Sequence, residues 1–155
     1  MNWSPDDMPS LGGRTAVVTG ANSGIGWYTA AELGKHGATV TLACRNLELG
    51  EQAAAKMRDA GAGDVRVAEL DLSSLASVEQ FAARWRGPLD LLVNNAGVMN
   101  PPTYRATEDG HELMFGTNHL GHFALTGRLL PALLAAPAPR VVTVASIAHH
   151  GGNEK

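Results

Sequence analysis

A glycine-rich segment near the N-terminus has the composition of a phosphate-binding turn. Glycines stand at positions 20, 24 and 26, after a short apolar run and before a stretch of helical character. Glycine lets backbone N–H groups approach phosphate oxygens, and the N-terminus of a helix adds a favourable dipole. The spacing Gly-x3-Gly-x-Gly differs from the usual Gly-x-Gly-x-x-Gly, and some glycine turns serve geometry alone. We expect this turn to hold the diphosphate of a dinucleotide, with the cofactor-binding residues Gly20, Asn22, Ser23, Gly24, Ile25 and Gly26.

An arginine stands where a dinucleotide-binding fold that prefers NAD places an acid. That acid bonds the ribose 2′-hydroxyl about twenty residues after the glycine turn. Here the corresponding residues are Cys44-Arg45-Asn46, which include no acid. An arginine suits a 2′-phosphate through its charge and its planar fork of donors. We therefore predict that Arg45 and Asn46 contact NADP(H) in preference to NAD(H), with a solvated surface arginine as the alternative.

Three further groups of polar residues follow predicted strands. Asp71-Leu72 could read an adenine by hydrogen bonding, and an acid at a helix N-terminus explains it equally well. In Asn94-Asn95-Ala96-Gly97, position favours cofactor contact through Asn94, Ala96 and Gly97, and a purely structural turn competes with that interpretation. Ser146 could donate to a substrate oxygen, but an isolated serine is weak support.

The pattern of apolar residues predicts five strands that alternate with four helices. The strands are expected at residues 14–19, 39–43, 65–67, 89–93 and 140–145, and the helices at 25–36, 47–60, 74–85 and 108–135. This alternation, with mostly apolar strands, is typical of a parallel sheet with helices on both faces. We predict a Rossmann-type doubly wound α/β fold of strand order 3-2-1-4-5, with the strand at 65–67 at an edge. The glycine and asparagine turns then line one crevice at the switch point.

Helical spacing predicts which faces of the helices are buried. The expected sets are Gly26, Ala30 and Leu33; Leu49, Ala53, Met57 and Ala60; and Leu75, Val78, Ala82 and Trp85. The helix at 108–135 is apolar on most sides, and Pro131 should kink or loosen its last turns. This helix and the unpaired strand at 140–145 should make the isolated chain aggregate or oligomerise.

Composition and charge argue against several classes of protein. The 155 residues are 45% hydrophobic and 17% charged, and the net charge of -3 without a basic run argues against nucleic acid. A single cysteine, Cys44, fits a reducing compartment. Without a signal peptide or an apolar stretch of membrane-spanning length, a cytoplasmic chain is expected. Residues 1–13 should form an arm, and 14–155 one nucleotide-binding domain.

The histidines do not form a convincing site. His119 and His122 lie one helical turn apart, and His149 follows Ser146 closely. Without carboxylate or thiol partners at ligand spacing, packing or solvation explains them better than a metal. A hydrolase built on Ser146 and His149 is disfavoured because no Gly-x-Ser-x-Gly elbow surrounds the serine.

Together these motifs resemble those of the short-chain dehydrogenases/reductases. Thr19-Gly20-x-x-x-Gly24-Ile25-Gly26 resembles the cofactor turn of that family, and Asn94-Asn95-Ala96-Gly97 resembles its second motif. Asn118 resembles its helix-borne asparagine and Ser146 its active-site serine. Segments 109–123 and 146–149 are most similar to the retinol-dehydrogenase-like branch, which acts on alcohols, aldehydes and ketones, often hydrophobic ones.

The resemblance implies a hydride transfer between NADP(H) and an alcohol or carbonyl carbon. A tyrosine would be the general acid/base, its pKa lowered by a lysine four residues later. Ser146 would hydrogen-bond the substrate oxygen, and the Asn118 carbonyl, at a local helix irregularity, would hold a proton-relaying water. The Tyr-x-x-x-Lys pair follows the serine in the family and is absent from these 155 residues, whose tyrosines are Tyr28 and Tyr104.

Two interpretations follow. The chain is either a C-terminally truncated NADP(H)-dependent oxidoreductase or a short chain that binds nucleotide or a partner without turnover. Ser146 and Asn118 favour the first, because a binding protein does not need them. In both cases we expect little dehydrogenase activity from the chain itself.

Overall fold

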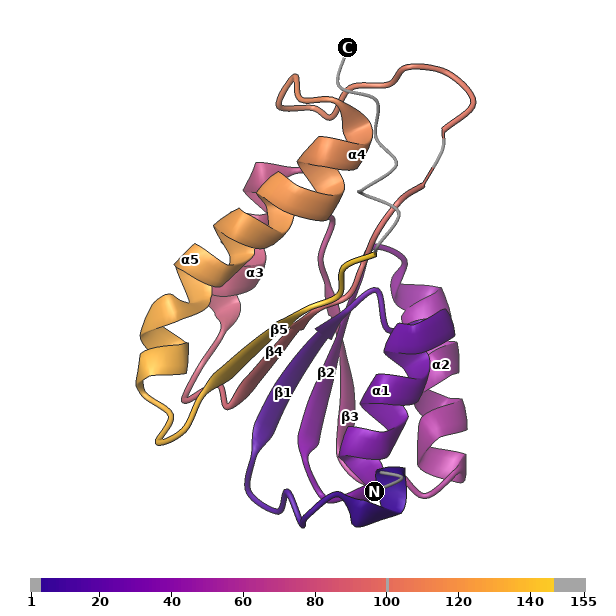
Figure 1. Cartoon of the computed structure of the whole chain (residues 1–155), viewed down its shortest axis with the longest axis vertical. Coiled ribbons are helices and arrows are strands. Elements are labelled where there is room, and N and C mark those ends of the chain that lie inside the picture. Colours follow the sequence, from indigo (N-terminus) through magenta and orange to yellow (C-terminus); the bar gives the residue numbers. More distant parts are fainter. Residues whose placement is uncertain (1–3, 100, 147–155) are drawn as a thin grey trace.

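The fold is a five-stranded parallel sheet with helices on both faces (Figure 1). The computed structural model describes residues 4–99 and 101–146. The strands lie in the order β3-β2-β1-β4-β5, and every neighbouring pair is parallel. The predicted Rossmann-type topology is therefore confirmed.

The strands agree with the predicted positions to within a few residues. They are β1 (Thr15–Thr19), β2 (Thr39–Cys44), β3 (Val65–Glu69), β4 (Leu91–Asn94) and β5 (Arg140–Thr143). A short 3-10 turn, η1 (Pro5–Asp7), precedes them. The start of the sheet is tied by Asp90, whose carboxylate accepts from the Arg14 guanidinium at 2.6 Å and from the Thr15 N–H at 2.9 Å.

The helices divide between the two faces of the sheet. The first face carries α1 (Gly24–Lys35) and α2 (Leu47–Asp59), and the second carries α3 (Leu75–Arg84) and α5 (Gly121–Leu134). Before α5 come one turn of helix, α4 (Leu113–Phe115), and the π-helical turn η2 (Gly116–Leu120). No helix in the described part of the chain is long and apolar enough to cross a membrane.

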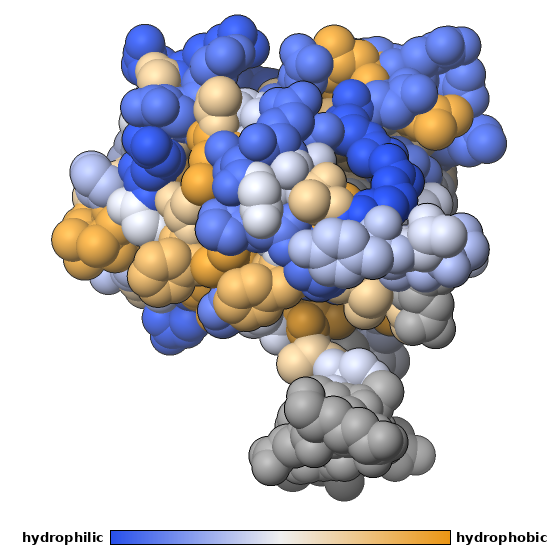
Figure 2. All heavy atoms as spheres, turned by 90° about the horizontal axis from the view of Figure 1, so that it is seen from above, coloured by the Kyte–Doolittle hydropathy of each residue, from blue (hydrophilic) through white to orange (hydrophobic). Residues whose placement is uncertain are grey.

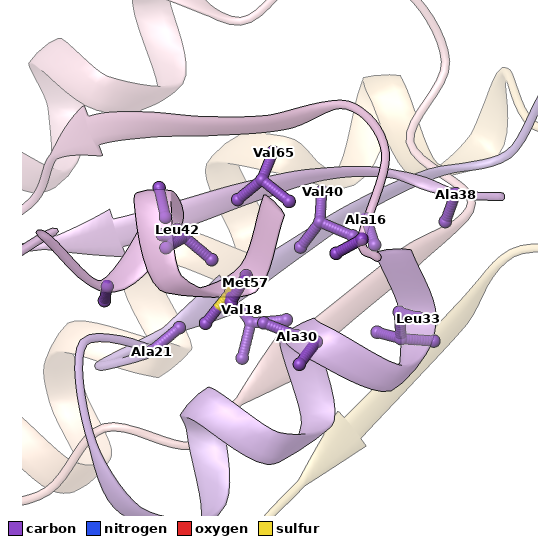
Figure 3. Packing of buried hydrophobic residues seen from close by; sticks show 14 of the residues in the cluster. Ala16, Val18, Ala21, Ala30, Leu33, Ala38, Val40, Leu42, Met57 and Val65 are labelled. Carbon is purple, nitrogen blue, oxygen red and sulfur yellow. The ribbon is translucent and has the colours of Figure 1, made fainter. Parts of the chain in front are cut away.

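Alternation along the strands builds two cores. Ala16 and Val18 pack with α1 and α2 in the first core, which Figure 3 shows from close by, whereas Val17 between them joins the second core under α3 and α5. Apolar side chains on both faces explain why these strands read as nearly continuous apolar runs. The face of α1 predicted from Gly26, Ala30 and Leu33 is buried as expected.

The prediction for α2 was wrong at its first and last positions, Leu49 and Ala60, which are both exposed. Leu49 is 46% exposed, and the buried face runs instead through Gly50, Ala53, Ala54 and Met57. Gly50 explains the rotation, because a Cβ there would lie 3.7 Å from Cys44 Cβ and would collide with Val67. The helix therefore lies close to the sheet on its glycine side, which turns Leu49 outward.

The last helix begins later than predicted, at Leu113 instead of residue 108. The intervening residues form a loop closed by a bridge between Ala106 and Glu112. The Glu112 side chain accepts from the N–H groups of Met114 and Phe115 and so caps the helix start. At the other end, α5 continues through Pro131 to Leu134.

The helix α5 and the edge strand β5 expose apolar side chains. Phe123 and Leu134 on α5 are 75% and 72% exposed, and Val141, Val142 and Val144 in and after the edge strand β5 are each nearly half exposed. Figure 2, which looks down on the end where the strand carboxyl termini lie, shows apolar patches between hydrophilic ones. This exposure is the physical basis of the predicted association.

Candidate nucleotide-binding site

The glycine turn and the asparagine turn meet at the carboxyl ends of β1 and β4. A Cβ on Gly20, whose φ is +64°, would lie 2.9 Å from both Cα and Cβ of Ala96. A Cβ on Gly26 would lie 2.9 Å from the Gly20 carbonyl oxygen and would collide with the Asn95 amide. The two glycines therefore have a packing role, which brings the α1 N-terminus and both turns together. At Gly24, with φ +57°, nothing lies within 4 Å, so only the backbone conformation requires glycine there.

Thr19, at the end of β1, holds the asparagine turn in place. Its Oγ1 accepts from the N–H groups of Asn95 and Ala96, both at 2.9 Å. The Asn95 amide in turn donates to the Thr19 carbonyl at 2.8 Å. The structural role that competed with cofactor contact is thus filled by Asn95, which the sequence analysis left out of the predicted site.

Asn94 directs its side chain away from this crevice. It is buried, and its amide donates to Thr126 on α5 at 3.1 Å and to Thr143 on β5 at 3.5 Å. Its Oδ1 has no hydrogen-bond partner among the described residues. A cofactor contact from Asn94 is therefore restricted to its main chain.

The end of β2 lies against the glycine turn. Gly20 N–H donates to the Ala43 carbonyl at 2.9 Å. Burial raises the pKa of the Cys44 thiol, and backbone hydrogen bonds from Ala21 and Asn22 partly offset that rise, so these groups are adjacent. Arg45 follows directly, is exposed, and makes no hydrogen bond or ion pair with the described residues. Its guanidinium is therefore available to an anion beside the turn.

Asn46 has a structural task as well. Its Oδ1 accepts from the Leu49 N–H at 3.0 Å and caps α2. Between α1 and α2, Asn22 and Gly24 line a pocket of about 380 Å³ that also contains Lys56, a cation the sequence analysis did not consider. A larger pocket, about 550 Å³, lies between β2, β3 and α3 and contains none of the predicted site residues.

Asp71 and Leu72 form the turn that leads into α3. Asp71 Oδ1 accepts from the Ser73 N–H at 2.9 Å and from the Ser73 hydroxyl at 2.6 Å. These bonds favour the structural interpretation of Asp71. Leu72 is buried, and a Cβ on Gly121 would collide with its carbonyl oxygen, so α5 passes directly over this turn.

The irregularity predicted at Asn118 is the π-helical turn η2. Its wider ring is closed by the Gly121 N–H, which donates to the Gly116 carbonyl. The Asn118 side chain accepts from the Val98 N–H at 2.8 Å and donates to the Val98 carbonyl at 2.9 Å. Asn118 therefore fixes the segment that follows the asparagine turn.

The structure separates the two helix-borne histidines. His119 is exposed and stacks on Phe115 with 5.2 Å between ring centroids. His122 is only 5% exposed, with Nε2 2.9 Å from Thr19 Oγ1 and Nδ1 2.9 Å from the Asn118 carbonyl oxygen. Burial lowers the pKa of His122, and the bond to the Asn118 carbonyl partly opposes that shift. Within residues 4–99 and 101–146, no three metal-ligating side chains come together.

Comparison with known protein families decides the membership of the chain. The family model for short chain dehydrogenases matches residues 14–155. The chain belongs to the short-chain dehydrogenase family. Human retinol dehydrogenases 13 and 12 are 45% and 48% identical to it over 148 and 146 residues, which cover 93% and 92% of this chain. The family branch predicted from the sequence, retinol-dehydrogenase-like, is thereby confirmed.

Solved structures of short-chain dehydrogenases and similar proteins share the fold. A Mycobacterium paratuberculosis protein of uncharacterised function is 52% identical, with a TM-score of 0.86, over 96% of this chain and 52% of that one. RhlG of Pseudomonas aeruginosa, in a complex with NADP, is 34% identical with a TM-score of 0.76, over 90% of this chain and 57% of that one. The chain spans about half the length of the relatives it matches, 44% and 46% for the two human dehydrogenases.

Ser146, which resembles the serine of the short-chain dehydrogenases, lies three residues beyond β5 and is exposed. It is thus at the carboxyl end of the sheet, as predicted. His149 lies outside the described residues.

Proposed function

We propose that this chain is the nucleotide-binding part of an NADP(H)-dependent oxidoreductase that transfers hydride between nicotinamide and an alcohol or carbonyl substrate. The observation that carries the proposal is the close approach of the two turns at Gly20 and Gly26, beside an arginine with no partner among the described residues. At Gly20 and Gly26 the space that a Cβ would take is filled by Ala96 and the Asn95 amide, which brings the two turns together, and open space remains at Gly24. The nicotinamide, when bound, supplies or accepts the hydride.

Most of the proposed roles belong to residues that end or follow a strand of the sheet, from β3 to β5. The turn 20–26 binds the diphosphate, Arg45 and Asn46 bind the 2′-phosphate, and main-chain groups of residues 71–72 and 94–97 bind the rest of the nucleotide. Ser146 donates to the substrate oxygen. The Asn118 carbonyl accepts a hydrogen bond from a water that relays protons. The substrate is a hydrophobic small-molecule alcohol, aldehyde or ketone, in keeping with the names of the retinol dehydrogenases.

Charge at Arg45 gives the sharpest test. We expect Arg45→Gln to weaken NADPH binding about 10- to 100-fold, because a charge-assisted hydrogen bond contributes about 1.5–3 kcal/mol. NADH, which lacks the 2′-phosphate, should bind the variant and the parent chain alike. Both affinities are measured by calorimetric titration of the 155-residue chain.

The matched control is Arg84→Gln, another exposed arginine, at the end of α3. It should change neither affinity. Equal binding of NADPH and NADH by the parent chain would refute the cofactor preference, and loss of both on Arg45→Gln would show a general role in folding.

Turnover by the 155 residues alone should be small. Neither Tyr28 nor Tyr104 has a lysine four residues later, since Glu32 and Glu108 occupy those positions. Loss of a general acid/base commonly costs 10²–10⁴-fold in rate. NADPH binding without carbonyl reduction is the expected result. The alternative, a chain that binds nucleotide as its whole function, predicts that joining the downstream half of a relative restores no turnover.

A further inference from the structure

A single buried imidazole joins the three segments that surround the proposed cofactor site. His122 lies in the first turn of α5, 103 residues after Thr19 in the sequence, yet its Nε2 is 2.9 Å from Thr19 Oγ1. Its other nitrogen, Nδ1, is 2.9 Å from the Asn118 carbonyl oxygen in the π-helical turn. Both ring nitrogens of a histidine with 5% exposure are therefore engaged.

The partners fix where the protons lie. The Asn118 carbonyl can only accept, so Nδ1 carries the proton of the ring. In the neutral ring Nε2 is then an acceptor, and the Thr19 hydroxyl donates to it. The other acceptor near that hydroxyl, the Val93 carbonyl, is more distant at 3.4 Å. The same hydroxyl oxygen accepts from the N–H groups of Asn95 and Ala96, which occupies both of its lone pairs.

The bonds form one directed chain. It runs from the main chain of the asparagine turn to Thr19, from Thr19 to His122, and from His122 to the main chain at Asn118. Each bond polarises the next, so the loss of one member weakens the others. A carbonyl oxygen has two lone pairs, and His122 leaves one of those of Asn118 for a water.

We propose that His122 is a positioning residue, which through Thr19 and Asn118 holds the β1 end, the asparagine turn and the π-helical turn in one fixed relative arrangement. The use of this arrangement to bind a cofactor rests on the function proposed above. The hydrogen-bonded linkage through His122 does not depend on that function. Simple packing is the competing account, in which an apolar ring of similar size would serve equally well.

The linkage is tested without nucleotide by amide hydrogen exchange on the 155-residue chain. Thr19→Val keeps the volume and removes the hydroxyl. We expect it to raise exchange about tenfold at the amides of Gly116–Leu120, because it breaks the connection from Thr19 through His122 to the Asn118 carbonyl. Thr19→Ser, which restores the hydroxyl, should restore the protection. Packing alone predicts that Thr19→Val leaves these amides unchanged.

His122→Phe completes the cycle. In that background Thr19→Val should alter exchange in the π-helical turn by much less than tenfold, because the connection through His122 is already broken. A full tenfold effect that survives His122→Phe would overturn the proposal. If His122→Phe does not fold, ¹⁵N NMR of the parent chain decides the same point: Nδ1 protonated and Nε2 unprotonated supports it, and a protonated Nε2 overturns it.

A final titration with NADPH separates this inference from the proposed function. If the parent chain binds NADPH, Thr19→Val, His122→Phe and the double variant should all weaken binding by a similar factor. Additive losses in the double variant would contradict the linkage. If the parent chain does not bind NADPH, the proposed function fails, while the exchange experiment still decides the role of His122.

Discussion

Two glycines that lie in helices, Gly26 in α1 and Gly127 in α5, allow the effect of packing at the site to be measured separately from helix propensity. Alanine is favoured over glycine in a helix interior by about 1 kcal/mol, so Gly127→Ala on α5, with nothing within 4 Å of its added Cβ, should stabilise the chain by up to that amount. Gly26→Ala gains at most the same propensity. Its Cβ, however, would lie 2.9 Å from the Gly20 carbonyl oxygen and would collide with the Asn95 amide.

The cost at Gly26 has two parts. Forcing a methyl group into a filled space costs about 1–3 kcal/mol. Displacing the Asn95 amide breaks its 2.8 Å bond to the Thr19 carbonyl, for about another 1 kcal/mol. After the propensity gain, Gly26→Ala should destabilise the chain by about 1–3 kcal/mol, and NADPH affinity should fall with it because both turns move.

Urea unfolding followed by circular dichroism measures the difference between the two variants. We expect Gly127→Ala to raise the midpoint and Gly26→Ala to lower it, with similar slopes in both, since the surface exposed on unfolding hardly changes. Equal stability of the two variants would refute the close approach of α1 to the two turns. A stability loss at Gly26 without any loss of NADPH affinity would refute the placement of the phosphates there.

Three further perturbations test other parts of the molecule. Asp90→Asn should lower the free energy of unfolding by about 1.5–3 kcal/mol in a urea titration, because it weakens two charge-assisted hydrogen bonds to the start of β1. The control Asp64→Asn, which lies in an exposed ion pair, should lower it by less than about 1 kcal/mol. Burial lowers the pKa of His122, so below about pH 6.5 the unfolded chain binds a proton before the folded chain does, and the stability of the parent chain falls. The difference in stability between the parent chain and His122→Phe should therefore be smaller at pH 5.5 than at pH 7.5. Phe123→Glu, at a 75% exposed position on α5, should reduce association in sedimentation, Leu47→Glu on α2 should not, and a monodisperse parent monomer would contradict the association itself.

The sheet could be predicted because its signals are local. Apolar runs such as the one at 15–18 alternate with helical stretches, and glycines mark the ends of several helices, so the element order and the strand order 3-2-1-4-5 follow from general rules. The location of the crevice follows in turn, since strands one and four must flank the switch point. Arg45 could be placed beside the glycine turn because it directly follows β2, and β2 lies next to β1 in the predicted strand order.

Other features depend on contacts that the local pattern does not contain. Leu49 on α2 turns outward because the neighbouring Gly50 faces Val67, a residue of β3. The start of α4 depends on a side-chain cap from Glu112, although Asp109-Gly110 just before it, with Gly110 at φ +82°, is a local turn signal. The partners of Asn94 lie 32 and 49 residues away. A sequence reader sees the residue types in each case, but not which distant group satisfies them.

His122 shows most clearly how the site depends on residues outside its motifs. A lone histidine on an apolar helix is correctly interpreted as packing by default, and this one is indeed buried. Burial, however, obliges both ring nitrogens to find partners, since an unpaired polar group in the interior costs about 1–3 kcal/mol. The partners it finds are the Thr19 hydroxyl and the Asn118 carbonyl, and Thr19 in turn accepts from the asparagine turn. The geometry of the glycine-rich crevice is therefore set by a side chain from α5, on the opposite face of the sheet from α1.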